Sequence, residues 1–99
     1  MNKNNIEIIN KVSDFYKIVS VPSRLKIIAT LDEKELNVSD LCNEVDMTQS
    51  AISHQLAILK QFNIVKSRKQ GKEVYYSLAD SHIKDLIELT ITHIREENL

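Results

Sequence analysis

Apolar residues recur at helical spacing along most of the chain, and these stretches predict its helices. Between residues 6 and 19 they fall three or four positions apart, which predicts an amphipathic first helix that Asn5 caps and that contributes to a dimer interface. A helix-start signal around Pro22 predicts a second, shorter helix, which ends at the charged turn of residues 32–35.

Two short helices are predicted next, with a tight turn between them. The third helix has Val38, Leu41, Cys42 and Val45 on one face and Asn37 or Ser39 near its start. After the turn, Thr48 caps a fourth helix. Its apolar side consists of Ala51, Ile52, Leu56, Leu59 and, at the margin, Ile58, and its polar side of Gln49, Ser50, Ser53, His54 and Gln55. This arrangement is typical of a helix-turn-helix motif.

The pattern then changes from helical to alternating, which predicts two β-strands at residues 64–69 and 73–78. Gly71, the only glycine of the chain, lies between them, where a hairpin turn needs a positive φ. Asp80 begins a final helix. The predicted fold is therefore mainly α with a β-hairpin: a winged helix-turn-helix of four helices, two strands and a fifth helix, forming one domain over residues 1–99 and associating as a homodimer.

The net charge of the 99-residue chain is −1, but the charges are unevenly placed. Residues 48–78 contain five basic residues and one acidic residue, so this segment carries +4 and the remainder −5. A basic hairpin beside a helix-turn-helix predicts contact with double-stranded DNA. The candidate DNA-binding residues are Gln49, Ser50, Ser53 and His54 on the fourth helix and Lys66, Arg68, Lys69 and Lys72 on the hairpin. The structural alternatives are a solvated helix face and lysines that keep an edge hairpin soluble.

The compartment is inferred from apolar runs and cysteine content. The sequence has no run of about 20 apolar residues that would span a membrane, and its first ten residues lack the apolar core of a signal peptide. The single cysteine, Cys42, has no partner for an intrachain disulfide and is expected to be a small core residue. We therefore expect a cytoplasmic protein.

The final helix carries two potential metal half-sites, Asp80 with His82 and His93 with Glu96. The two histidines are roughly 16 Å apart along a helix, yet they lie on nearly the same face. An antiparallel copy of the helix would place Asp80 and His82 of one chain beside His93 and Glu96 of the other chain. The dimer would then have two equivalent sites. Two imidazoles and two carboxylates suit Zn²⁺, with Co²⁺ or Ni²⁺ as alternatives. Glu97 is a competing carboxylate, and Asp80 also fits a purely structural role as a helix cap.

Four stretches of the chain resemble the ArsR/SmtB family of metal-responsive winged-helix repressors. They are Val-Pro-Ser-Arg-Leu-Lys-Ile at residues 21–27, Glu-Leu-Asn-Val-Ser-Asp-Leu-Cys at residues 35–42, Gln-Ser-Ala-Ile-Ser-His-Gln-Leu at residues 49–56 and Val-Tyr-Tyr-Ser-Leu at residues 74–78. Asp80, His82, His93 and Glu96 also match the spacing of the zinc-sensing branch, Asp-x-His followed after ten residues by His-x-x-(Glu or His). The resemblance implies a dimer that represses genes for metal efflux or sequestration and leaves DNA when it binds metal.

The resemblance also implies a route from the metal to the DNA-binding helix. The second imidazole nitrogen of His93 would donate to a backbone carbonyl just after that helix, around residues 62–63. Zinc sensors of this kind can carry a cysteine where this chain has Asn37, so the sequence disfavours a thiolate-rich site for arsenic, lead or cadmium.

We predict a zinc-responsive repressor and not an enzyme. One alternative is a winged-helix regulator that responds to a redox or unknown signal. Another is a winged helix that binds proteins instead of DNA. A zinc hydrolase is the remaining alternative, and a closed shell of four ligands is unsuited to it, because a catalytic zinc keeps an open position.

Overall fold

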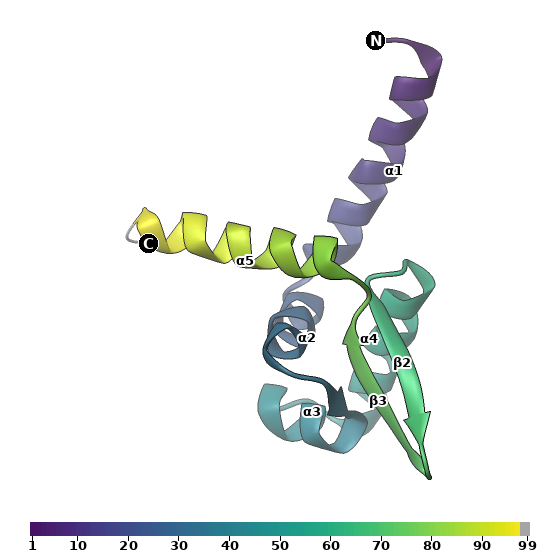
Figure 1. Cartoon of the computed structure of the whole chain (residues 1–99), viewed down its shortest axis with the longest axis vertical. Coiled ribbons are helices and arrows are strands. Elements are labelled where there is room, and N and C mark those ends of the chain that lie inside the picture. Colours follow the sequence, from purple (N-terminus) through teal and green to yellow (C-terminus); the bar gives the residue numbers. More distant parts are fainter. Residues whose placement is uncertain (98–99) are drawn as a thin grey trace.

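The structure is a computed structural model that describes residues 1–97. Its elements, in chain order, are α1 (Lys3–Val19), α2 (Pro22–Glu33), β1 (Leu36–Asn37), α3 (Val38–Val45), α4 (Gln49–Gln61), β2 (Val65–Gln70), β3 (Glu73–Leu78) and α5 (Ser81–Glu96). α3 and α4 form the helix-turn-helix, and β2 and β3 form the wing. α1 and α5 project from the body that the other elements make (Figure 1). The predicted winged helix-turn-helix is confirmed.

Short polar side chains cap most of the helices. Asn37, one of the two residues expected near the start of α3, caps that helix, and Thr48 caps α4 as predicted. The predicted Asn5 cap of α1 is wrong: the helix begins earlier, and the Asn5 N–H donates to Asn2 Oδ1 at 2.9 Å. α2 begins with Pro22, which has no N–H to satisfy, and has no side-chain cap.

The sheet has three antiparallel strands in the order β1-β3-β2, one strand more than the sequence predicts. In β1, Leu36 pairs with Tyr76 and Asn37 with Tyr75. A strand of two residues is too short to show the alternation that identifies strands in a sequence. Gly71 lies in the turn of the wing with a φ of 62°, as predicted.

The hydrophobic core lies between α2, the helix-turn-helix and the sheet. Its buried side chains are Ile27, Ile28, Leu31, Leu36, Leu41, Ile52, Leu56, Leu59, Ile64, Val65 and Leu78. Cys42 is half-buried and packs against this cluster, as expected for a small core residue. The core therefore fixes α4 relative to the wing, which is the arrangement that a DNA-binding surface needs.

The two projecting helices contribute no fully buried residue. Large apolar side chains stay exposed on both of them: Ile6, Ile8, Ile9, Val12 and Tyr16 on α1, and Leu89 and Ile94 on α5. On the other side of α5, Ile83 and Ile87 pack against the core of the same chain. Among residues 1–97, no helix combines the length and apolar character needed to cross a membrane.

Candidate functional site

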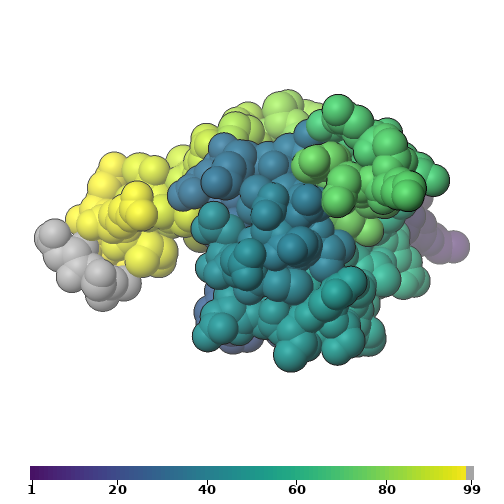
Figure 2. All heavy atoms as spheres, turned by 90° about the horizontal axis from the view of Figure 1, so that it is seen from below, coloured from purple at the N-terminus to yellow at the C-terminus, as the bar shows by residue number. Residues whose placement is uncertain are grey.

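The polar face of α4 is the first part of the candidate site. Ile52, Leu56 and Leu59 hold the inner face of α4 in the core, so its opposite face remains in solvent. The predicted contact residues Gln49, Ser50, Ser53 and His54 are all exposed. Seen from below, the helix-turn-helix and the wing lie on one continuous face of the molecule (Figure 2). The structure thus places the predicted reading helix and the predicted hairpin beside each other.

Gln55, which the sequence places on the polar side of α4, makes an internal contact instead. Its Oε1 accepts a hydrogen bond from Arg24 Nε at 2.7 Å, and Arg24 Nη1 also donates to the Ile18 carbonyl at 3.3 Å. One half-buried guanidinium therefore joins the end of α1, the start of α2 and the middle of α4. No local sequence pattern marks Arg24 as part of this contact, because its partner Gln55 lies 31 positions later in the chain.

The wing presents lysines to solvent. Lys66, Lys69 and Lys72 are exposed, and none of them forms an ion pair with a residue in the described part of the chain. Arg68 differs from them, because it pairs with Glu35. Three of the four basic residues predicted for DNA contact are therefore available to phosphate groups.

Asp80 and His82 form the first half-site, at the start of α5. Asp80 has extended backbone angles (φ −160°, ψ 179°), and its Oδ1 accepts a hydrogen bond from the Ile83 N–H at 3.0 Å. This hydrogen bond, with a smaller contribution from nearby His82, lowers the pKa of Asp80. His82 Nδ1 lies 3.6 Å from Asp80 Oδ1. Residues two apart in a helix point about 200° apart, so the non-helical cap is what lets these two side chains converge.

The second half-site lies at the other end of α5. His93 Nε2 is 3.1 Å from Glu97 Oε1, whereas no ion pair joins His93 and Glu96 among the described residues. The structure thus brings His93 together with Glu97, the alternative carboxylate to Glu96. No group of three ligating side chains comes together within residues 1–97. Each half-site is therefore incomplete in a single chain.

Both half-sites lie on one exposed face of α5. At about 100° per residue, His82, Leu89 and His93 fall within roughly 40° of one another. Leu89 lies between the half-sites and is 70% exposed. The donor set of this face, imidazole nitrogen and carboxylate oxygen, fits Zn²⁺ once a second face of the same kind supplies the missing ligands.

Polar contacts near both Ala79 and Lys84 add to the core packing of Ile83 and Ile87 in holding α5 against the body. The Ala79 N–H donates to the Ile64 carbonyl at 2.9 Å, so the first half-site lies beside the segment that follows α4. Lys84 Nζ donates to the Asp32 carbonyl at 2.6 Å and to Asp32 Oδ1 at 2.9 Å, which places a cation at the C-terminal end of α2. A displacement of α5 would therefore act on both α2 and the end of α4.

Asn37 stands where the sequence analysis considered a cysteine ligand. Its Oδ1 accepts a hydrogen bond from the Asp40 N–H at 2.8 Å, and its Nδ2 donates to Glu73 Oε2 at 3.2 Å. Both ends of the amide are thus used in local structure. Cys42 is the only cysteine of the chain, so a cluster of thiolates is not available.

Comparisons with known proteins agree on the class of protein. The family model described as bacterial regulatory protein, arsR family, matches residues 21–67. The chain is 39% identical over 88 residues to a transcriptional repressor SmtB homolog of Synechocystis sp., covering 89% of this chain and 67% of that protein. It is 43% identical over 86 residues to a cadmium resistance transcriptional regulatory protein CadC homolog of Staphylococcus aureus, covering 86% of this chain and 71% of that protein.

The fold also matches a solved structure. The chain superposes on a homodimeric winged helix-turn-helix DNA-binding domain of Mycobacterium bovis with a TM-score of 0.89. The match covers 98% of this chain and 90% of that domain. Its sequence is 23% identical, so it supports the fold alone. The relatives are transcriptional regulators and not enzymes, in agreement with the sequence analysis.

Proposed function

The chain belongs to the arsR family of bacterial regulatory proteins, and we propose that it is a metal-responsive transcriptional repressor that binds an inverted-repeat operator as a homodimer. The observation that carries the metal-responsive part is the pair of incomplete half-sites at the two ends of one exposed face of α5. The relative of Synechocystis is named a repressor, and the relative of Staphylococcus aureus is named for cadmium resistance.

DNA binding would use the exposed face of α4 and the lysines of the wing. Gln49, Ser50, Ser53 and His54 would meet base edges and phosphates in the major groove. Lys66, Lys69 and Lys72 would contact phosphates beside it. Two copies related by a two-fold axis would place their α4 helices in successive major grooves, which requires an inverted repeat in the DNA.

Dimerisation would cover the apolar faces of α1 and α5. An open apolar groove of about 240 Å³ lies between these helices, with Phe15 and Tyr16 on one side and Leu86 and Ile87 on the other. A second copy suits this surface because α1 and α5 both leave large apolar side chains exposed. If His82 lies beside the partner's His93, the two-fold axis crosses α5 next to Ile87 and Glu88, and Leu89 lies opposite the partner's Leu86, within about one helical turn of the partner's Leu89.

The metal ligands would come from both chains of this dimer. Asp80 and His82 of one chain, with the partner's His93 and the partner's Glu96, would hold Zn²⁺, and Co²⁺ or Ni²⁺ are the alternatives. The contact between His93 and Glu97 makes Glu97 a second candidate for the last ligand. An ion bound there would link the two α5 helices. Because Asn37 is used as a cap, we propose zinc and not cadmium as the signal, in contrast to the name of the CadC homolog.

The start of α5 offers a route to the DNA-binding helix. The Ala79 N–H donates a hydrogen bond to the carbonyl of Ile64. Ile64 comes three residues after the end of α4 and directly after Asn63, which has a φ of 58°. The partner's His93, placed beside Asp80, would donate its second imidazole N–H to a carbonyl around residues 62–63. Such a coupling is typically about 1–3 kcal/mol, which would weaken operator binding roughly 5- to 150-fold.

The test is a titration of DNA with and without Zn²⁺ at fixed salt. The probe is a fluorescent duplex carrying the inverted repeat that the wild-type protein selects from a random-sequence library. We expect Zn²⁺ to weaken binding by the factor above, and His82→Ala and His93→Ala to bind equally well with and without Zn²⁺. Asp14→Asn, a carboxylate change on α1, is the matched control and should keep the response. Selection of no duplex would contradict DNA binding, and a wild type whose DNA binding is unchanged by Zn²⁺, Co²⁺ and Ni²⁺ would contradict metal sensing.

A further inference from the structure

We propose that Arg68 is a positioning residue that fastens the wing to the segment before α3 through Glu35, and that it does not contact phosphate. This inference rests on the proposed DNA-binding function and changes the role expected for one of its residues. The four residues concerned, Glu35, Arg68, Gln70 and Tyr75, are called the wing clasp below.

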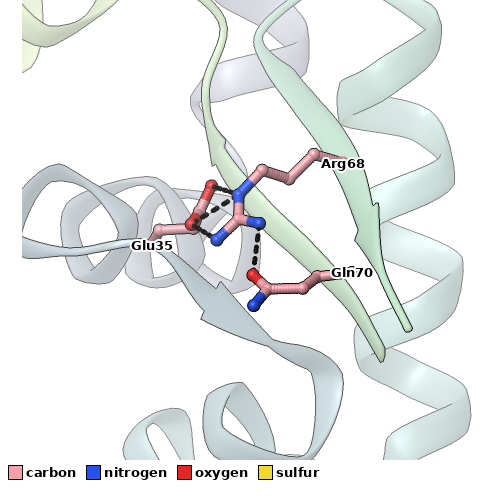
Figure 3. Close-up of polar contacts among 3 residues, drawn as sticks. All are labelled: Glu35, Arg68 and Gln70. Carbon is pink, nitrogen blue, oxygen red and sulfur yellow. Dashed lines mark hydrogen bonds and ion pairs between the residues drawn. The ribbon is translucent and has the colours of Figure 1, made fainter. Parts of the chain in front are cut away.

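The side chain of Arg68 is held by Glu35 on one edge of the guanidinium and by Gln70 at Nη1 (Figure 3). Arg68 Nε donates to both carboxylate oxygens of Glu35 at 2.9 Å, and Arg68 Nη2 donates to Glu35 Oε1 at 2.5 Å. Arg68 Nη1 donates to Gln70 Oε1 at 2.7 Å. The centre of the guanidinium lies 4.9 Å from the centroid of the Tyr75 ring. All three nitrogens and one face of the group therefore already have partners within the chain.

A phosphate bound through the Nε and Nη2 edge would need the same atoms that Glu35 occupies. Arginine binds phosphate and carboxylate alike through two parallel N–H groups on one edge of the guanidinium. The hydrogen bond from Arg68 lowers the pKa of Glu35, and the same bond raises the pKa of Arg68, so both groups stay charged at neutral pH. The pair presents no net charge to DNA, whereas Lys66, Lys69 and Lys72 each present a full positive charge.

The position of Glu35 explains what the contact achieves. Glu35 directly precedes β1, which pairs with β3, while Arg68 lies on β2 at the far edge of the sheet. The wing clasp therefore spans all three strands. Asn37 adds a second tie, because it caps α3 and donates to Glu73. β1 has only two residues, so these side-chain contacts add to the buried core in holding the outer part of the wing relative to the helix-turn-helix.

Three single variants separate the two roles of Arg68. Glu35→Gln removes a negative charge near the DNA, so simple electrostatics predicts tighter binding to the selected duplex. If Arg68 were able to contact phosphate, its release from Glu35 would also tighten binding. If Arg68 is a positioning residue, Glu35→Gln must instead weaken binding to the selected duplex, in the same direction as Arg68→Gln. The double variant should then bind no more weakly than the more affected single variant. Glu33→Gln, which removes the same charge at an exposed site two residues away, should not weaken binding.

A measurement without DNA keeps this inference separate from the proposed function. Amide hydrogen exchange of β1 and the wing should be faster in Glu35→Gln and Arg68→Gln than in the wild type and in Glu33→Gln. If the wild type selects no duplex, the proposed function fails, while the exchange rates still decide whether the wing clasp holds the wing. Exchange that is unchanged in both clasp variants, or binding by Glu35→Gln that equals or exceeds that of the wild type, would overturn the inference.

Discussion

Replacement of Leu89 by lysine should break the dimer without unfolding the chain. The side chain of Leu89 is 70% exposed, so little of its apolar surface is buried within its own chain. Covering the exposed part in a dimer is worth about 1–2 kcal/mol for each copy, or about 2–4 kcal/mol for two copies. Loss of this amount weakens dimerisation roughly 30- to 700-fold, and two lysine charges close to the two-fold axis add repulsion.

The dissociation constant of the dimer can be measured by sedimentation equilibrium in metal-free buffer. Thermal unfolding at a concentration where both proteins are monomeric should show the same stability for Leu89→Lys and the wild type. Asn43→Lys, which adds the same charge at an exposed site on α3, is the matched control and should dimerise normally. Dimerisation of Leu89→Lys at wild-type strength would refute the antiparallel contact between α5 helices.

Two further predictions concern contacts that join distant parts of the chain. The bond between Arg24 and Gln55 should give an interaction energy of about 1 kcal/mol in a double-mutant cycle of Arg24→Met and Gln55→Leu, measured by urea unfolding; additive effects would contradict a direct contact. The stabilising effect of Glu35 should depend on pH, because its hydrogen bond with Arg68 lowers its pKa in the folded chain. The difference in stability between the wild type and Glu35→Gln should be complete above about pH 4.3, the ordinary value for glutamate, and disappear as pH falls through the lowered pKa; an equal difference at pH 3 and pH 6 would contradict it.

The sequence predicted the fold well wherever a local pattern specifies it. Helical spacing of apolar residues and helix-start residues together located the five helices, and the single glycine located the turn of the wing. The two errors have local causes. Asn5 lies in an Asn-rich start in which several residues are suitable caps, and the structure uses Asn2. β1 has only two residues, which is too short to produce an alternating pattern. Its pairing partners also lie in the wing, nearly forty residues later in the chain.

The candidate site was predicted less completely, because its contacts join residues far apart in the sequence. The exposed residues of α4 follow from helical geometry, and the structure leaves them in solvent. At the ends of α5, Asp80 lies near His82 as the sequence suggests, whereas His93 contacts Glu97 and not the predicted Glu96. The environment of Arg68 depends on Glu35, 33 residues earlier, and no local pattern indicates such a pair. A basic residue on a wing therefore indicates DNA contact only after its partners within the chain are known.

The central claim is that each metal site takes ligands from two chains, and mixed dimers test it most directly. One chain carries Asp80→Ala and His82→Ala, and the other carries His93→Ala with Glu96→Ala and Glu97→Ala. Either variant alone leaves only half of each site, so neither homodimer should bind Zn²⁺ tightly. A mixed dimer, purified through two different affinity tags, contains one complete site and one empty site. Titration against a chelating indicator should find one Zn²⁺ per mixed dimer at wild-type affinity, whereas a mixed dimer that binds no better than its parents would contradict the account.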